Sequence, residues 1–433
     1  MKNQTLIKWT TLLLCCLLNN IGFSQTLELS FLGRYSTGTY DAGGSEISAY
    51  DPSSKRLFSV NGSTGNVDII NLANPSSPTL INSFSLSAYG AAANSVAAKN
   101  GIVAIAVEAT VKQDSGKVVF IDANGNLLKS VTVGALPDMI CFSPDGNYVL
   151  VANEGEPNST YTVDPEGSVA IINISSGAAN ATVSIARFNG FNGSALPYGI
   201  RIYGPGATVA QDIEPEYIAV SANSQTAWVT CQENNCWAII DIASATVTSL
   251  VPMGFKNHSL AGNGMDASDQ NSGIVNINTW PVRGMYQPDA IASFIVNGQT
   301  YLVSANEGDA RAYTGFSEES RISSSSYILD PVKFPNAATL KSTSNIGRLN
   351  VTNKFGDIDS DGDFDTIYCY GARSISIWND AGGLVWDSGD QLEQLMLQLQ
   401  PNNFNCSNTN NTKKNRSDDK GPEPEAVTVA NIG

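Results

Sequence analysis

Five aspartates crowd into nine positions of the stretch FGDIDSDGDFDTIYCYGARS, residues 355–374. They are Asp357, Asp359, Asp361, Asp363 and Asp365. Carboxylates at loop positions 1, 3, 5 and 9, with a glycine at position 6 (here Gly362), match the ligand pattern of calcium loops. An EF-hand would also need Glu at position 12, where Tyr368 stands, and flanking helices, whereas TIYCYG is typical of a strand. The spacing predicts a short calcium loop beside a strand, and the alternative is a solvated Asp/Gly turn.

Acidic residues also recur at the start of similar segments, such as LPDMICFSPDGNYVLVANEGEP and QPDAIASFIVNGQTYLVSANEGDAR. The opening acids of the five copies are Glu46, Asp138, Glu216, Asp289 and Glu425. In three copies a second acid follows the second apolar run, at Glu154, Glu233 and Glu307. If the first strand of each copy lines a central channel, these acids gather at its mouth.

Two interpretations of this channel-mouth set remain open. Carboxylate oxygens, with Arg311 and Arg373 nearby in sequence, suit a metal site or a cation-binding face that accepts phosphorylated or acidic-sugar ligands. Alternatively, each acid caps a turn within its own repeat, and the arginines form salt bridges with the acids.

The elements that must position these acids are strands. Each copy reads as strand, turn, strand, loop and often a third strand, and one motif recurs at one place in each unit. This pattern predicts an all-β β-propeller of seven blades, rather than a sandwich or β-helix. The segment 366–389 is interpreted as the second to fourth strands of a sixth blade, and the seventh is expected to be incomplete, because the chain stops at Gly433. Residues 311–356 and 390–420 are expected as insertions, the second beginning with a helix.

The N-terminal segment MKNQTLIKWTTLLLCCLLNNIGFSQ carries Lys2 and Lys8 around the start of a short apolar run, with Gly22 and Ser24 before Gln25. This predicts a secretory signal over residues 1–24 and a mature propeller over 25–433, secreted or at the cell surface. No other stretch is long and apolar enough to span a bilayer, so no transmembrane segment is expected in the mature chain.

The 433 residues include 40 acidic and 24 basic side chains, a net charge of −16. This balance argues against binding of nucleic acid through a basic face and suits a cation-binding extracellular protein. Cys231 and Cys236 flank QENN in a predicted hairpin, where a disulfide or two buried thiols are the alternatives. His258 is the only histidine, which excludes a histidine-rich zinc site.

Several motifs in order, among them GALPDMICFSPDGNYVLVANEGEP, YLVSANEGDAR and FGDIDSDGDFDTIYCYGARSISIW, resemble the choice-of-anchor I family. These are secreted propeller proteins, and they include mesenchyme-specific cell-surface glycoproteins and members described as alkaline-phosphatase-like. The resemblance covers nearly all of the mature chain and implies an exported, calcium-associated propeller.

Two functions follow as hypotheses. The first is a calcium-binding module of the cell surface that acts as a binding or scaffold unit. The second is a metal-dependent phosphoester hydrolase, with a second metal in the channel-mouth acids, since no nucleophile elbow or phosphate-binding loop is present in the sequence.

Overall fold

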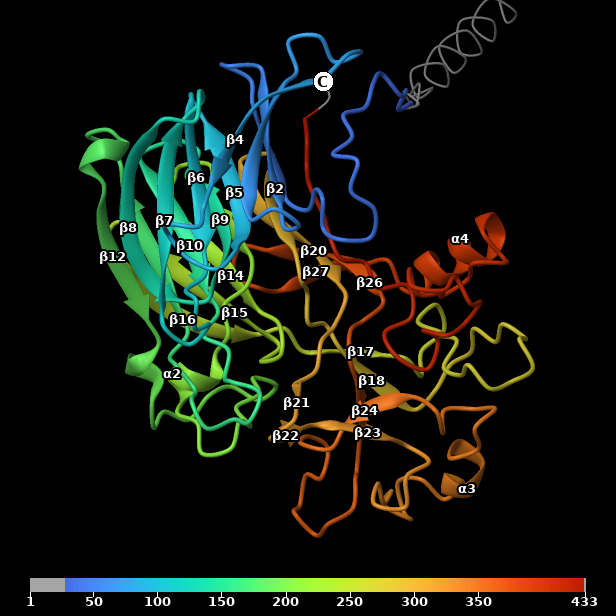
Figure 1. The fold of residues 1–433 in the computed structure, drawn as a ribbon. Helices are drawn as coiled ribbons and strands as arrows, with labels where there is room; N and C mark the ends of the chain where they lie inside the picture. The colour runs from blue at the N-terminus through green and yellow to red at the C-terminus, as the bar shows by residue number, and fades with distance from the viewer. Residues whose placement is uncertain (1–27, 432–433) are drawn as a thin grey trace, which may run out of the picture.

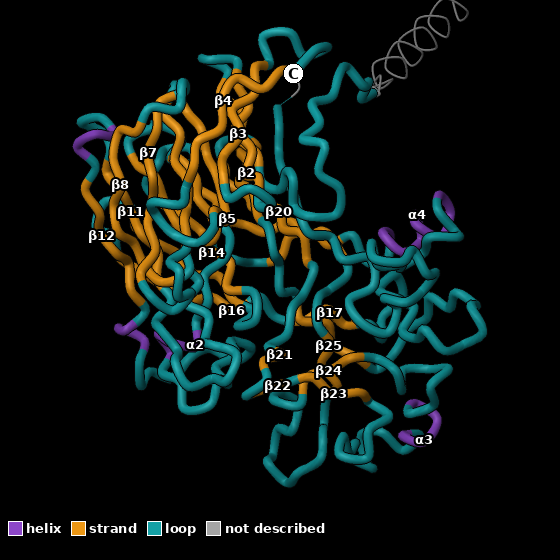
Figure 2. Tube along the Cα trace, viewed as in Figure 1, coloured by secondary structure: helices purple, strands orange, loops and turns teal. Residues whose placement is uncertain are grey.

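A computed structural model describes residues 28–431 and shows a chain built almost entirely of strands and loops (Figures 1 and 2). The predicted signal segment lies outside the described residues. Within them, no helix has the length and hydrophobicity that crossing a bilayer requires.

Four consecutive antiparallel sheets of four strands each follow chain order. The first contains β1 (Ser48–Asp51), β2 (Arg56–Asn61), β3 (Asn66–Asn71) and β4 (Thr79–Ser85). The second contains β5 (Ala93–Lys99), β6 (Ile102–Val107), β7 (Ser115–Asp122) and β8 (Leu127–Ala135). The third contains β9 (Pro137–Phe142), β10 (Tyr148–Asn153), β11 (Ser168–Asn173) and β12 (Thr182–Arg187). The fourth contains β13 (Ile218–Val220), β14 (Thr226–Cys231), β15 (Cys236–Asp241) and β16 (Thr246–Pro252), after the short helix α2 (Val209–Asp212).

The strands form because their sequences are apolar on both faces. In β10, Val149, Leu150, Val151 and Ala152 are all fully buried, so both sides of the strand are covered. The apolar clusters that cover them lie between successive sheets: one joins the first and second, one the second and third, and one the third and fourth. The first strands of neighbouring sheets also contact each other. Sheets stacked face to face around their first strands are the blades of a β-propeller, whereas a sandwich buries one face of each sheet.

A fifth four-stranded sheet is split by a long excursion of the chain. Its order is β19 (Ile291–Val296), β20 (Gln299–Asn306), β26 (Ser374–Asn379) and β27 (Leu384–Asp387), and β19 contacts β13 of the preceding sheet. The prediction of a separate sixth blade over 366–389 was therefore wrong. Its last two strands complete the blade that begins at Ile291, because the insertion falls between the second and third strands of that blade.

Strands of this excursion form a separate sheet at the lower right of Figure 1, together with two strands that precede β19 in the chain. Its strands, in spatial order, are β17 (Phe255–Asn257), β18 (Val282–Met285), β25 (Ile367–Cys369), β24 (Asn350–Thr352) and β23 (Glu319–Arg321). β18 and β25 are parallel, so residues 255–285 join residues 319–369 in one mixed sheet. A small hairpin of β21 (Ala312–Tyr313) and β22 (Phe316–Ser317), the helix α3 (Ala337–Leu340) and the helix α4 (Gln391–Leu399) complete this part of the molecule.

The predicted number of blades is not confirmed. Described residues form five four-stranded sheets, and residues 388–431 contain no strand. The segment that was expected to open a seventh blade instead lies along the fifth and fourth: Val429 and Ala430 line the same hollow as Ser293 of β19 and Val220 of β13.

Candidate functional site

The five-aspartate loop connects β24 to β25 of the mixed sheet, not two strands of a propeller blade. Carboxylate oxygens of Asp357, Asp359 and Asp361 lie within 4.8 Å of one another. Among the described residues this is the one group of three acidic, histidine or cysteine side chains that comes so close. The distance fits a single ion held by oxygen ligands, which Ca²⁺ prefers.

Backbone amides shape this loop around its carboxylates. The Ile358 N–H donates to Asp365 Oδ2 at 2.8 Å, and the Gly362 N–H donates to Asp357 Oδ2 at 3.1 Å. Gly362 has a φ of +99°, where a side chain would be strained, which explains the glycine at this position. Asp357 Oδ1 is buried and has no hydrogen-bond partner among the described residues.

Charge is concentrated in the loop as well. Desolvation first, and then the neighbouring Asp361 carboxylate, raise the pKa of both Asp359 and Asp363. The donor set of carboxylates and carbonyls, together with the unpaired Asp357 oxygen, fits a hard cation such as Ca²⁺.

The repeat acids meet at one edge because of strand register. In each antiparallel pair, the start of the first strand lies beside the end of the second. Glu154 follows β10, and its N–H donates to the Leu136 carbonyl just before β9 at 2.8 Å. Cys231 ends β14, and the Glu216 N–H bonds to the adjacent Thr230 carbonyl at 2.9 Å. The same edge of the third, fourth and fifth sheets therefore carries the acids.

We call the resulting group the acid cluster. Its members are Asp138, Glu154, Glu156, Glu214, Glu216, Glu233, Asp289, Glu307 and Asp309. Burial, and then the carboxylates of Glu156, Asp138 and Glu233 in that order, raise the pKa of Glu154. Acids of three successive blades thus share one electrostatic environment.

Burial dominates the titration of the cluster. It raises the pKa of Glu233 to about 7, with the Asp309 charge adding to the shift, and that of Asp289 to about 7, with help from Glu307. Burial and the Glu156 charge raise the pKa of Asp138 to about 6. For Glu216, burial and the Glu233 charge push the pKa well above its ordinary value. All of these shifts arise because ionised carboxylates are removed from water next to like charges.

Arg311 lies beside the cluster but is fully engaged. Its guanidinium is 1% exposed and forms ion pairs with Asp212 (2.7 Å) and Glu214 (3.0 Å), stacked over the Tyr203 ring at 4.7 Å. This is the salt-bridge alternative considered for the arginines, with Asp212 as a partner that the repeat pattern did not indicate.

Two lysines from distant loops border the cluster. Lys420 contacts Glu307 at 3.0 Å and Asp309 at 3.5 Å, and Lys112 contacts Glu156 at 3.1 Å. Neither lysine belongs to the repeated motif, so only the folded chain brings them to this edge. No local sequence signal pointed to them.

Three of the predicted channel-mouth residues do not join the acid cluster. Arg373 is buried against α4, where it pairs with Glu393 at 2.8 Å and donates to the Ser417 and Asp419 carbonyls. Glu46 and Glu425 are exposed. Glu425 still contributes to the raised pKa of Asp289, after burial and Glu307.

Cys231 and Cys236 face each other as neighbours in register across β14 and β15. Both are buried free thiols in the structure, and a disulfide between them stays a prediction. Burial, followed by the contact with Cys236, raises the pKa of the Cys231 thiol well above its ordinary value.

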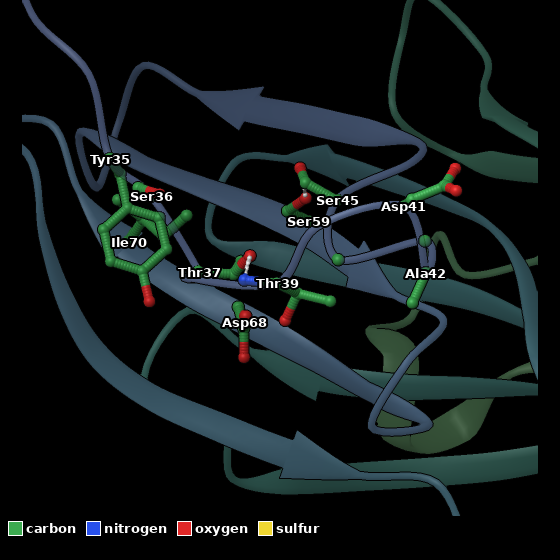
Figure 3. A pocket seen from close by; sticks show the side chains of 12 residues that line it. Tyr35, Ser36, Thr37, Thr39, Asp41, Ala42, Ser45, Ser59, Asp68 and Ile70 are labelled. Carbon is green, nitrogen blue, oxygen red and sulfur yellow. Dashed lines mark hydrogen bonds between the residues drawn. The ribbon is translucent and has the colours of Figure 1, made fainter.

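A separate polar hollow of about 500 Å³ lies where residues 35–45 cross the first blade (Figure 3). Thr37, Thr39 and Asp68 are among the residues that line it, as are Ser45 and Ser59, whose hydroxyls are 2.7 Å apart. Asp68 is already bonded to Asn61 and Ser83, so its carboxylate has partners within the blade.

Known relatives match parts of this chain. A mesenchyme-specific cell surface glycoprotein of Strongylocentrotus purpuratus is 26% identical over 275 residues, which are 54% of this chain and 34% of the relative. Gigasin-3a of Magallana gigas is 35% identical over 94 residues, 20% of this chain and 33% of the relative. The chain thus spans about a third of the length of either relative.

Among solved structures, a protein from Lactobacillus plantarum is 15% identical with a TM-score of 0.39, covering 61% of this chain and 64% of that one. The family comparison reaches much further along the chain, because the choice-of-anchor I domain matches residues 46–433. That range contains every blade, the mixed sheet, the five-aspartate loop and the acid cluster. The chain therefore belongs to the choice-of-anchor I family.

Proposed function

We propose that this protein is an extracellular binding or scaffold module whose insertion is held in place by Ca²⁺ in the loop 357–365. Membership of the choice-of-anchor I family and the likeness to a cell-surface glycoprotein support an extracellular location. The predicted secretory signal agrees with it. The observation that carries the calcium assignment is the convergence of Asp357, Asp359 and Asp361 within 4.8 Å.

The loop is attached to the insertion that it would fix. Phe364 N–H donates to the Ile328 carbonyl at 2.8 Å, and the Phe364 ring stacks on Tyr327 with centroids 4.0 Å apart. An ion bound by the three aspartates, with Asp365 and the Asp363 carbonyl available as further oxygens, would hold the loop closed against residues 327–330. The chain between β23 and β24 would be stabilised with it.

A local test is trypsin cleavage after Lys354, an exposed residue three positions before Asp357. We expect 1 mM Ca²⁺ to slow this cleavage at least about tenfold relative to EDTA, because a closed loop enters the protease less readily. Asp357→Ala with Asp361→Ala should abolish the protection, whereas Asp114→Ala with Asp380→Ala, two exposed acids elsewhere, should keep it. Equal cleavage of the wild-type chain with and without Ca²⁺ would contradict the assignment of Ca²⁺ to this loop.

The hydrolase alternative receives no support from the arginines that were expected to hold a phosphate. Arg311 and Arg373 are both buried and paired with carboxylates. We expect no metal-dependent hydrolysis of a chromogenic phosphate monoester by this chain. Turnover that is lost in Glu154→Gln or Glu307→Gln would revive the hydrolase.

A further inference from the structure

Two carboxylates of the acid cluster each have a buried oxygen that no hydrogen bond from a described residue satisfies. Glu216 and Glu233 are only 8% and 7% exposed. Oε2 of each is fully buried and has no hydrogen-bond partner among the described residues. Their charges act on each other, so the two side chains lie in the same confined space. Burying an ionised carboxylate without a partner is strongly unfavourable.

The bases of the protein near this site are already occupied. Arg311 pairs with Asp212 and Glu214, at the side of the fourth blade. Lys112 and Lys420 pair with Glu156, Glu307 and Asp309 at the periphery. Glu154, Glu216 and Glu233 thus form no ion pair with a described basic residue. A positive charge from outside the chain would complete the site.

We propose that the acid cluster is a second cation site, in which a hard divalent metal ion lies among Glu154, Glu216 and Glu233 and joins adjacent blades of the propeller. The available ligand atoms are carboxylate oxygens, with neither histidine nor a deprotonated thiol among them. Oxygen-only sites select Ca²⁺, Mg²⁺ or Mn²⁺ over softer metals.

The spacing of the cluster indicates how the ion is held. No three of these carboxylates have oxygens within 4.8 Å of one another, unlike the three of the five-aspartate loop. The ion therefore keeps part of its water shell and reaches some carboxylates through water, as Mg²⁺ commonly does in proteins. The raised pKa values of Glu216 and Glu233 agree with a site that is neutralised by protons when no metal is bound.

This site is independent of the five-aspartate loop. The loop lies between β24 and β25, whereas the cluster lies at the edge of the third to fifth blades. Either metal assignment can therefore be disproved without the other. A variant that lacks the loop carboxylates isolates the cluster for measurement.

The test is equilibrium dialysis of the mature chain against Ca²⁺ or Mg²⁺ at pH 8, followed by metal analysis. Asp357→Ala with Asp361→Ala should retain one ion per chain. Adding Glu216→Gln and Glu233→Gln to this variant should remove that ion or weaken its binding at least tenfold. Glu166→Gln, a half-exposed acid in the loop between β10 and β11, is the matched control and should leave the metal content unchanged.

Comparing the amounts of Ca²⁺ and Mg²⁺ retained shows which ion the site prefers, and retention of either ion supports the proposal. Thermal melting confirms that each variant is folded, and Glu216→Gln alone replaces the double change if the latter does not fold. Binding of neither Ca²⁺ nor Mg²⁺ by the Asp357→Ala, Asp361→Ala variant would overturn the proposal. So would equal metal content with and without Glu216 and Glu233.

Discussion

Two regions of this molecule concentrate carboxylates, and they differ in how water reaches them. In the five-aspartate loop, Asp359 and Asp361 are exposed, and loop amides satisfy much of the remaining charge. In the acid cluster, Glu214, Glu216 and Glu233 are buried, and each has an oxygen without a partner. Asp359 and Asp361 of the loop carry their charge in contact with solvent, whereas the buried charge of the cluster must be neutralised by a base, a proton or a metal ion. Carboxylates therefore serve local shape in one region and charge balance between blades in the other.

Removing the cluster's own base should produce the largest effect. Arg311→Met deletes the partner of Asp212 and Glu214 and leaves two carboxylates buried without it. We expect the free energy of unfolding to fall by about 3–5 kcal/mol, the usual cost of breaking a buried ion pair from one side. Urea unfolding at pH 7 measures it. Arg187→Met, which removes a half-exposed pair with Glu166, is the control and should cost much less. A loss for Arg311→Met no greater than that of the control would contradict the buried charge network.

The second prediction is that the acid cluster, and not the five-aspartate loop, makes stability depend on pH near neutrality. Folding raises the pKa of Glu233 and Asp289 to about 7. Between the ordinary pKa of these carboxyls and about 7, the folded chain therefore holds protons that the unfolded chain has already released. Stability from these groups is full below the unfolded pKa and is lost as the pH rises through about 7. In EDTA, the melting temperature should therefore fall between pH 6.5 and 8.

The lower limit of that window avoids His258. Burial and the Lys256 charge lower the pKa of this histidine to about 3, so its contribution runs the opposite way and is lost as the pH falls below 6.5. Glu233→Gln with Asp289→Asn should flatten the slope between pH 6.5 and 8. Asp359→Asn should leave it as in the wild-type chain. A slope that is insensitive to the first pair would show that the cluster does not titrate in this range.

The sequence predicted the repeated part of the molecule well, because one motif recurs at the same place in each unit and so shows how the strands of a unit are aligned. The recurring strand–turn–strand units appear as blades, and acids at the start of one strand and the end of the next do share an edge. Three of the five opening acids, Asp138, Glu216 and Asp289, meet in the cluster. Their burial could not be read from the motif, since it depends on what other loops lay over them.

The insertions were harder to predict for a physical reason. β25 has three residues and pairs with β18, more than eighty positions earlier, and a strand so short shows no alternation that would indicate its sheet. Ile367 therefore looked like part of the blade that follows it. Arg373 looked like a neighbour of the repeat acids for the same reason, whereas its partners are Asp266 and residues of the segment 393–419. The predicted blade count is not confirmed, in part because these strands were assigned to a blade of their own.

The most direct measurement compares two single amide substitutions in metal-free protein at pH 8. Glu233→Gln removes a buried like charge, and Asp359→Asn removes one in the exposed loop. Urea unfolding in EDTA should show Glu233→Gln more stable than wild type by about 3 kcal/mol, as the raised pKa implies. Asp359→Asn should leave the unfolding midpoint within experimental error of the wild-type value. A destabilised Glu233→Gln, or equal effects of the two substitutions, would contradict the distinction between the buried cluster and the exposed loop in how strongly like charges destabilise the metal-free fold.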